Sequence, residues 1–430
     1  PYMLQSDYDL HELPAGRTQL LHWAQQHEVF CWLEGTPSVD QDYTFPTLLA
    51  LGVRRSFELT PAISLASLDE FLSPTEIGYV VQIGYGLKDR LERLSTRHSD
   101  PIGFPALYLF EPLILIRFTG QHHVSIQATD PNAVWQAIRS VVIEPVTNPI
   151  PKVDFRARSD REEYLAHLKS VQAHIRRGDC YELNYCQEFF ATDIRIDPVQ
   201  VYLAMQALAQ APFSSLYRHG DRWLIGASPE RFLLRRGDRI ESMPMKGTAP
   251  RDADPVLDEA RATSLMQSEK DRSENIMVVD LVRNDLSRVA ERGSVQVESL
   301  CALRSFPQVH QLVSTVSCRL KPGQSFRQIL EACFPMGSMT GAPKIRVMEL
   351  TDRYETSARG LYSGSIGFME PNGNFDLNVV IRSLQYQSAQ QYLSYHVGSG
   401  ITVYSDPSIE WEECLWKARA IRRVFSGERV

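Results

Sequence analysis

The chain of 430 residues is 43% hydrophobic and 23% charged, which is typical of a globular protein with core for one large domain or two to three ordinary ones. Its net charge of −7 argues against broad nucleic-acid binding, and no apolar run approaches the roughly 20 residues that cross a bilayer. The seven cysteines include no C-x-x-C pair and no basic-then-apolar leader opens the sequence, so we expect reduced thiols in a cytoplasmic protein.

Residues 1–152 carry no dense polar motif. Residues 107–110 and 113–116 are apolar runs on either side of a turn, and they predict two buried strands. Three prolines near the end of this region predict an extended linker over residues 143–151. We therefore expect an N-terminal region and a second region, residues 153–430, that pack together as one interleaved unit.

Local signals after the linker predict hairpins and helices in alternation. Ser159 and Glu162 have capping-box spacing, and the apolar stripe that follows predicts a helix that ends before Gly178. Hairpins are expected around residues 236–238, 372–373 and 388–390, and helices over residues 256–290, 324–333, 343–355 and 407–424. This order favours an α+β fold in which antiparallel sheets are flanked by helices.

The lysine at position 246 has an unusual local setting. It lies between Pro244 and Gly247, directly after the first of these hairpins. Proline fixes the chain direction and glycine allows close backbone approach. Such a setting suits an amine that points into a cavity, where loss of water lowers its pKa and makes it nucleophilic. A structural turn whose lysine reaches solvent is the alternative, and local sequence alone favours that alternative.

Two predicted helices present acidic faces. Asp271 and Glu274 are three residues apart on the first helix. The second helix can begin with Asp406 as its cap, and the residues that share one of its faces are Glu410, Glu413 and Lys417. Carboxylates from two helices could hold Mg²⁺, which takes one or two carboxylates directly and keeps waters and substrate oxygens. Two solvated faces are the alternative.

Two glycine-rich segments and one arginine point to anion binding. Residues 334–344 lead into a predicted helix near Pro343, whose free N–H groups would favour an anion, although an ordinary loop has the same pattern. Residues 398–400 follow a predicted strand, and their glycines would let backbone amides approach a carboxylate. Arg382 lies inside a strand-like apolar run, where it needs either an internal carboxylate or an anionic substrate as its partner.

In this order, these segments together resemble the chorismate-utilising enzymes, a family that includes anthranilate, aminodeoxychorismate, isochorismate and salicylate synthases. The resemblance is close over residues 153–425 and loose before them. The matching segments are residues 178–181, 228–232, 243–251, 270–275, 341–344 and 362–367 and the acidic helix near the C-terminus. The resemblance implies the two-layered chorismate-binding fold, with the active site between antiparallel sheets.

The resemblance also implies a reaction. Lys246 stands where aminodeoxychorismate-forming members typically carry lysine and anthranilate-forming members usually carry a small residue. This implies that ammonia aminates chorismate to 4-amino-4-deoxychorismate, toward 4-aminobenzoate and folate. Lys246 would be the covalent nucleophile at C2, and Glu230 the general acid at the C4 hydroxyl. Anthranilate formation and an inactive chorismate-binding regulatory subunit are the alternatives.

The other site residues are carried over from the family in the same way. Mg²⁺ is implied on Glu274 and Glu413, with Asp271 and Glu410 as indirect or water-mediated ligands. The substrate contacts implied are Tyr362 and Arg382 for the enolpyruvyl carboxylate, Gly398, Ser399 and Gly400 for the ring carboxylate with Lys417 nearby, and Thr248, Gly337, Ser338 and Thr340 elsewhere in the site.

Three features depart from the family pattern. Glu182 stands where many relatives have glutamine and isochorismate-forming members have a lysine base, which argues against isochorismate formation. Gln311 replaces a histidine that is associated with pyruvate loss in anthranilate-forming members. His310, its neighbour, is either a partial substitute or structural. Residues 30–35 match the tryptophan-binding segment of relatives only loosely, so tryptophan binding is left open.

The source of ammonia is implied by a missing motif. The sequence contains no Gly-x-Cys-x-Gly nucleophile segment of a glutaminase. The family therefore implies a separate glutamine amidotransferase subunit as the partner that supplies ammonia. No lyase segment is recognisable either, so the formation of 4-aminobenzoate would need another enzyme.

Overall fold

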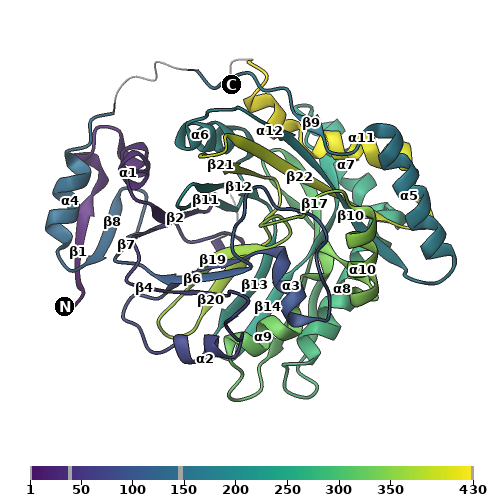
Figure 1. The fold of residues 1–430 in the computed structure, drawn as a ribbon, viewed down its shortest axis with the longest axis horizontal. Helices are drawn as coiled ribbons and strands as arrows, with labels where there is room; N and C mark the ends of the chain where they lie inside the picture. The colour runs from purple at the N-terminus through teal and green to yellow at the C-terminus, as the bar shows by residue number, and fades with distance from the viewer. Residues whose placement is uncertain (1, 37–40, 144–148, 428–430) are drawn as a thin grey trace.

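Two large antiparallel sheets lie at the centre of the fold, with helices on their outer faces (Figure 1). The computed structural model describes residues 2–36, 41–143 and 149–427. Within these residues the first sheet has 12 strands and the second has 10. The predicted α+β fold of antiparallel sheets flanked by helices is therefore confirmed.

The strands of the first sheet, in order across it, are β1 (Leu4–Asp9), β8 (His123–Ala128), β7 (Ile114–Phe118), β3 (Leu48–Leu51), β2 (Val29–Glu34), β11 (Phe213–His219), β12 (Arg222–Ser228), β21 (Ser383–Gln387), β22 (Tyr392–Ile401), β10 (Glu182–Ala191) and β18 (Gly341–Ala342), with β9 (Arg156–Ala157) beside β10. Those of the second sheet are β15 (Met245–Pro250), β17 (Val309–Arg319), β14 (Arg239–Met243), β13 (Arg231–Arg236), β20 (Phe375–Asn378), β19 (Ser365–Met369), β5 (Tyr79–Ile83), β6 (Leu107–Glu111) and β4 (Arg55–Glu58), with β16 (Gln296–Ser305) beside β17.

The α-helices are α1 (Gly16–Ala24), α2 (Ser67–Phe71), α3 (Lys88–Leu91), α4 (Pro131–Arg139), α5 (Arg161–Arg176), α6 (Pro198–Ala209), α7 (Pro255–Gln267), α8 (Glu269–Ser287), α9 (Phe326–Cys333), α10 (Lys344–Tyr354), α11 (Pro407–Lys417) and α12 (Arg419–Val424). Short 3₁₀ turns are η1 (Leu10–Glu12), η2 (Gln41–Tyr43), η3 (Tyr85–Leu87) and η4 (Gly337–Met339). None of the helices in the described ranges is long and apolar enough to cross a membrane.

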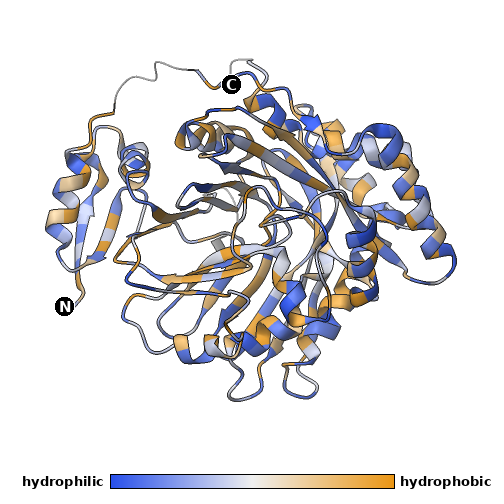
Figure 2. Ribbon diagram, in the orientation of Figure 1, coloured by the Kyte–Doolittle hydropathy of each residue, from blue (hydrophilic) through white to orange (hydrophobic). Residues whose placement is uncertain are grey.

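Hydrophobic side chains fill three main layers of core. One lies between the two sheets, where Phe110 from β6 and Phe213 from β11 are fully buried. The other two lie between each sheet and the helices that cover it, with Leu168 of α5 in one and Val278 of α8 in the other. Figure 2 shows hydrophobic residues along the strands and many hydrophilic residues on the peripheral helices. Since apolar burial is the main favourable term in folding, this layered core fixes where the sheets meet.

Both halves of the chain contribute strands to both sheets. β2 pairs with β11 in the first sheet, and β5 pairs with β19 in the second. The two strands predicted at 107–110 and 113–116 are present as β6 and β7, but they belong to different sheets, so the turn between them carries the chain across the core. Most of the predicted linker, residues 144–148, lies outside the described residues, and the division at residue 152 stays a prediction.

Local caps explain where several helices differ from their predicted bounds. Asp160, and not Ser159, caps α5 by accepting a hydrogen bond from the N–H of Glu163. The run predicted as one helix over 256–290 is two helices, because the Ser268 side chain caps α8. α11 begins as predicted, with Asp406 as its cap.

The three predicted hairpins are present as β13–β14, β19–β20 and β21–β22. All seven cysteines lie within the described residues, where each is buried and unpaired.

A buried ion pair fixes the wall from which the site is built. The Arg359 guanidinium donates to both carboxylate oxygens of Glu355 at 2.6 and 3.0 Å. It also donates to the carbonyls of Met339 and Asn184 at 2.8 and 2.9 Å. Because Arg359 and Glu355 are almost completely buried, the loss of one partner would leave an uncompensated charge in the core.

We expect Glu355→Ala to lower the free energy of unfolding by about 3–5 kcal/mol, the cost of breaking a buried pair. Glu349→Ala is the matched control, because the Glu349 side chain on α10 is 46% exposed and pairs with Arg346. It should cost less than about 1 kcal/mol. Urea denaturation of both variants measures the difference, and equal losses would contradict a structural role for the buried pair.

Candidate active site

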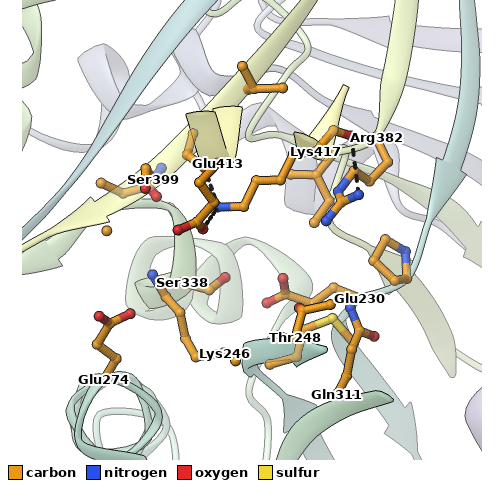
Figure 3. A pocket seen from close by; sticks show the side chains of 18 of the residues that line it. Glu230, Lys246, Thr248, Glu274, Gln311, Ser338, Arg382, Ser399, Glu413 and Lys417 are labelled. Atoms are coloured by element: carbon orange, nitrogen blue, oxygen red, sulfur yellow. Dashed lines mark hydrogen bonds and ion pairs between the residues drawn. The ribbon is translucent and has the colours of Figure 1, made fainter. Parts of the chain in front are cut away.

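A cavity of about 300 Å³ lies between the two sheets, near the lower limit for small-molecule sites. Strands β10 and β22 line it from the first sheet, β15 and β17 line it from the second, and α8 and α11 complete the wall. The predicted site residues that line it are Glu230, Lys246, Thr248, Asp271, Glu274, Ser338, Tyr362, Arg382, Gly398, Ser399, Gly400, Glu410, Glu413 and Lys417 (Figure 3). Segments far apart in the sequence thus converge on one cavity.

Two predicted substrate contacts, Gly337 and Thr340, do not line this cavity. A Cβ on Gly337 would lie 3.0 Å from the Cβ of Leu281, so this glycine allows η4 to pack against α8. Thr340 is buried, and its hydroxyl donates to the carbonyl of Met336 at 3.1 Å. Of this turn, only Ser338 and Met339 line the cavity. The structure therefore assigns packing contacts, rather than a place in the cavity wall, to both residues.

The same segment places the start of α10, where an anion was one expectation, outside this cavity. Gly341 and Ala342 form β18, which pairs with Glu182 and Leu183 of β10. Gly341 has a φ of +143°, and a Cβ there would lie 2.1 Å from the carbonyl oxygen of Glu182. The glycine is required because two backbones meet closely, and the first turn of α10 does not line the cavity.

Lys246 lies in β15 and extends into the cavity, with Glu274 on one side and Glu230 on the other (Figure 3). Its Nζ donates to Oε1 of Glu182 at 3.1 Å. The expectation of a lowered pKa is wrong: burial would lower the pKa of the amine, but the carboxylates of Glu182 and Glu274 outweigh burial and raise it. In the free protein this lysine is therefore held as an ammonium group.

Glu230 follows β12 and is buried at the opposite side of the cavity from Glu274 (Figure 3). Burial raises the pKa of this carboxyl to about 7, although the nearby Lys246 opposes the shift. A carboxyl group with this pKa is largely protonated at slightly acid pH and partly protonated at neutral pH. It can therefore donate a proton to a bound molecule, as a general acid must.

The acidic faces of α8 and α11 meet across the cavity. Burial raises the pKa of Glu274 to about 7, whereas Glu413 pairs with Lys417 at 2.6 Å, and its pKa is lowered because this ammonium group outweighs burial. Glu410 is almost fully buried and accepts a hydrogen bond from Ser399. Asp271 is held by the cap of α8, where it accepts a hydrogen bond from Ser268. These contacts disfavour the alternative, in which the acidic faces of α8 and α11 simply face solvent.

Lys270 is a cavity residue to which the sequence assigned no role. Its ammonium group lies 4.0 Å from Oε1 of Glu274 and 3.7 Å from Oε1 of Glu410. Those two buried oxygens accept no hydrogen bond from any described residue. A cation is thus attracted to the space between α8 and α11. The signal in the sequence was the spacing of Lys270 and Glu274 by four residues on one helix.

The glycines of β22 leave room for functional side chains. Gly398 and Gly400 lie within the strand, not after it, and pair with Cys186 and Asn184 of β10. A Cβ on Gly400 would lie 2.6 Å from Oε1 of Glu182 and 2.7 Å from Nζ of Lys246. Since both atoms are ends of side chains, an alanine there would displace the pair without blocking the strand.

We expect Gly400→Ala to fold normally and to lose about 10²-fold in kcat, as a displacement near 1 Å can cause. The control is Gly120→Ala, because a Cβ at Gly120 meets nothing within 4 Å. Thermal unfolding should give similar midpoints for both variants, and steady-state kinetics should separate them. Equal kcat values for the two variants would show that close packing over Lys246 has no catalytic consequence.

Arg382 is not part of a strand, contrary to the sequence prediction. It has a φ of +51° and lies in the kink between β20 and β21. Its Nη1 donates to the carbonyl of Lys417 at 3.2 Å, and no carboxylate of a described residue lies within ion-pair distance. Burial lowers its pKa. Of the two partners considered for Arg382, an internal carboxylate and an anionic substrate, the lack of a described carboxylate within ion-pair distance favours the substrate.

Tyr362 and Lys417 occupy the same side of the cavity. Tyr362 stacks on His396 with ring centroids 5.2 Å apart. Lys417 donates to the carbonyl of Gly398 at 2.8 Å while it pairs with Glu413. Arg382, Lys417 and the Tyr362 hydroxyl therefore gather on one side of the cavity, whereas Glu274 and Glu410 lie with Lys270 on another. Such a distribution suits a small anion that also has a group to be protonated.

Gln311 and His310 face different ways. Gln311 of β17 lines the cavity beside Thr248, its register partner on β15. The buried Oε1 of Gln311 has no hydrogen-bond partner among the described residues. His310 is buried outside the lining, where its ring nitrogens contact Ser305 and Asp258 at 2.8 and 2.9 Å. Of the two alternatives for His310, its contacts favour the structural one.

The sequence matches the chorismate binding enzyme family over residues 52–423, most of its length. The chain belongs to the chorismate-binding enzymes. Curated chorismate-binding enzymes similar to it include aminodeoxychorismate synthase component 1 from Klebsiella aerogenes, 38% identical over 346 residues (79% of this chain, 75% of the relative), and from Escherichia coli strain K12, 36% identical over 351 residues (81% and 77%). Anthranilate synthase component 1 1 from Haloarcula marismortui is 37% identical over 322 residues (74% and 64%).

Solved chorismate-binding enzymes have the same fold. The crystal structure of anthranilate synthase component I from Streptococcus pneumoniae TIGR4 superposes with a TM-score of 0.78 at 25% identity, covering 91% of this chain and 95% of that one. The menaquinone-specific isochorismate synthase of Escherichia coli also gives a TM-score of 0.78, at 17% identity over 99% and 95% of the two chains. The second likeness supports the fold alone.

Proposed function

We propose that this chorismate-binding enzyme is component 1 of an aminodeoxychorismate synthase, which converts chorismate and ammonia to 4-amino-4-deoxychorismate. The observation that carries the proposal is the amine of Lys246, which extends into the cavity between the sheets near a buried carboxyl group. The relatives from Klebsiella aerogenes and Escherichia coli support it, since both are named aminodeoxychorismate synthase component 1. An inactive regulatory subunit would have no need for this pairing of amine and acid.

The geometry suggests how the reaction proceeds. Glu230, whose pKa is about 7, gives its proton to the C4 hydroxyl, which leaves as water. Lys246 forms a bond to C2 as the ring double bonds shift. Ammonia then attacks C4, and the amine of Lys246 leaves C2. Two substitutions of moderate difficulty replace a single difficult one.

The cationic end of the cavity suits the two carboxylates of the substrate. Arg382 and Tyr362 would hold the enolpyruvyl carboxylate, because the guanidinium has no internal carboxylate among its described neighbours. The ring carboxylate would lie against the backbone of residues 398–400, near Lys417. Binding both groups orients C2 toward Lys246 and C4 toward Glu230.

Magnesium fits the carboxylate end of the cavity. Among the described residues, no three His, Cys, Asp or Glu side chains meet closely enough to form a metal site by themselves. Mg²⁺ usually takes only one or two carboxylates directly and fills its other positions with water and substrate oxygens. Glu274 and Glu413 would hold it, with Asp271 and Glu410 through water. The Oε1 atoms of Glu274 and Glu410 support this, because they accept no hydrogen bond from a described residue and already attract the ammonium group of Lys270. When bound, the ion supplies positive charge that neutralises the ring carboxylate and draws electrons from the ring.

We expect Glu274→Gln to weaken Mg²⁺ binding by about 10-fold or more, since an anionic ligand becomes neutral. Calorimetric titration of Mg²⁺ into the protein with chorismate measures the affinity directly. Glu269→Gln is the control, because Glu269 lies on the same helix but outside the cavity lining. Unchanged Mg²⁺ affinity in Glu274→Gln would place the ion elsewhere.

A product assay tests the proposed function. Chorismate, Mg²⁺ and an ammonium salt should give 4-amino-4-deoxychorismate, identified by its mass. Anthranilate and pyruvate would instead identify an anthranilate synthase, the activity named for the Haloarcula marismortui relative. Lys246 and Gln311 in the cavity favour the first outcome, since the resemblance associates them with amination without pyruvate loss.

The ammonia source and the cellular location belong to the same proposal. The designation component 1 of the similar relatives supports a second subunit, which we take to be a glutamine amidotransferase that delivers ammonia. The cytoplasm, where chorismate and reduced thiols occur together, remains the expected location. Activity with ammonium salt but not with glutamine for the isolated chain would support the need for the partner.

A further inference from the structure

Glu182 is a buried carboxylate that has no role in the reaction outlined above. It lies at the start of β10 and is 3% exposed. Its Oε1 accepts a hydrogen bond from Nζ of Lys246 at 3.1 Å, whereas its buried Oε2 has no partner among the described residues. A buried charge costs free energy unless a partner compensates it, and the partner here is the nucleophile itself.

The surrounding backbone closes over this pair. Gly400 of β22 lies next to it, so that a Cβ would come within 2.7 Å of the amine and 2.6 Å of the carboxylate. Behind Glu182, its own carbonyl meets β18, where Gly341 permits the close contact. Glu182 and Lys246 are therefore held together in a space with no room for a larger intervening group.

The reaction requires Lys246 to lose a proton. An ammonium group has no lone pair and cannot attack C2. The charged groups that face Lys246 are Glu182 from β10, Glu230 after β12, Glu274 from α8 and Glu413 from α11. Glu230 must itself be protonated to act as the acid, while Glu274 and Glu413 would be engaged with the cation. Among the residues that the structure describes, only Glu182 makes a direct hydrogen bond to the amine.

We propose that Glu182 is the general base that activates Lys246, an inference that rests on the proposed function. The Nζ proton passes along the existing hydrogen bond to Oε1 of Glu182, and the lone pair left on Nζ forms the bond to C2. The C4 hydroxyl leaves as water with the proton from Glu230. When ammonia attacks C4, Lys246 leaves C2 as a neutral amine and recovers its proton from Glu182. The new C4 ammonium group gives its extra proton to Glu230, which restores both carboxyl groups.

Enclosure of the pair favours this transfer. Before transfer the pair consists of two charges, and after it of two neutral groups. A medium of low dielectric disfavours charged forms, so the exclusion of water when substrate fills the cavity shifts the balance toward the neutral amine. A glutamine at this position could neither carry this charge nor accept the proton.

Glu182→Gln tests the inference, because the amide preserves the shape of the side chain and removes its basicity. We expect kcat at pH 7 to fall about 10²-fold, the lower range for general-base catalysis. Lys246 in the variant must lose its proton to solvent. The ratio of wild-type kcat to variant kcat should therefore fall about tenfold per pH unit between pH 7 and 9. KM for chorismate should change little.

Glu188→Gln is the matched control. Glu188 lies on the same strand, is equally buried, and pairs with Arg158 at 2.9 Å outside the cavity. This variant also loses a buried ion pair, yet its kcat should stay within about threefold of wild type at every pH. A deficit with the same pH dependence in both variants would reduce Glu182 to a structural role.

The remaining outcomes are distinct. If wild type forms 4-amino-4-deoxychorismate and Glu182→Gln has the same or a higher kcat, Glu182 is not the base and the proposed function stands. If the deficit of Glu182→Gln is constant from pH 7 to 9, the inference is also overturned. If wild type forms another product, the proposed function fails, and the mass of that product shows it directly.

Discussion

Replacement of Lys246 by alanine should reduce the rate of 4-amino-4-deoxychorismate formation by at least about 10³-fold, because the step that forms the bond to C2 is lost. The expected loss is in kcat, since the contacts proposed for the two substrate carboxylates come from other residues. The assay uses chorismate, Mg²⁺ and a moderate concentration of ammonium salt. Mass spectrometry of the intact protein during turnover should show a substrate adduct in wild type and none in the variant.

Lys169→Ala is the control, since Lys169 lies on the exposed face of α5. It should have wild-type activity and the same unfolding midpoint as the parent protein. Lys246→Ala leaves the buried carboxylate of Glu182 without its ion-pair partner, so its unfolding midpoint should be lower, and kcat is compared at a temperature where the variant is folded. Wild-type kcat in Lys246→Ala with ammonia would show that the amine is not the nucleophile, and direct attack of ammonia at C4 would replace the covalent route.

Glu230→Gln should lower kcat by about 10²–10⁴-fold, the usual contribution of a general acid. The sign of the pH dependence follows from the pKa of about 7. The protonated carboxyl is present below this pKa and lost above it, so kcat of wild type should fall about tenfold per pH unit as the pH rises beyond 7. The residual activity of Glu230→Gln should lack this decline.

Glu163→Gln, at an exposed position of α5, provides the comparison for Glu230→Gln and should reproduce the wild-type profile. The measurement is kcat at saturating chorismate from pH 6 to 9. A decline above pH 7 that persists in Glu230→Gln would assign the titration to another group. In that case the raised pKa of Glu230 would reflect burial without catalysis.

Local sequence patterns were sufficient for most elements but not for the convergence of the motifs. Alternation and turn residues predicted the hairpin that ends before Lys246, and helix periodicity placed Glu274 and Glu413 on acidic faces. Their meeting in one cavity followed from the resemblance and not from spacing. The carboxylates that face Lys246 come from β10 and α8, so a pattern around residue 246 alone could not indicate that its pKa is raised.

The errors have related physical causes. The run around Arg382 is as apolar as a strand, but the chain turns there with a positive φ as it passes from one sheet to the other. The sequence predicted the two strands beside residues 111–113 but could not show that each completes a different sheet. These sheet assignments depend on partners elsewhere in the chain: β21 pairs with β12, whose residues lie more than 150 positions earlier, and β6 and β7 pair with β5 and β3.

The shared sheets also bear on how this chain folds during synthesis. Strands β2 and β5 can pair early with β3 and β6, but their other partners, β11 and β19, follow about 180 and 280 residues later. At about 5–20 residues per second, one edge of each strand therefore waits on the order of ten seconds or more for its second partner. Meanwhile their apolar faces and open backbone edges are exposed to other nascent chains. Aggregation of these exposed faces and edges would therefore compete with folding until β11 and β19 are made.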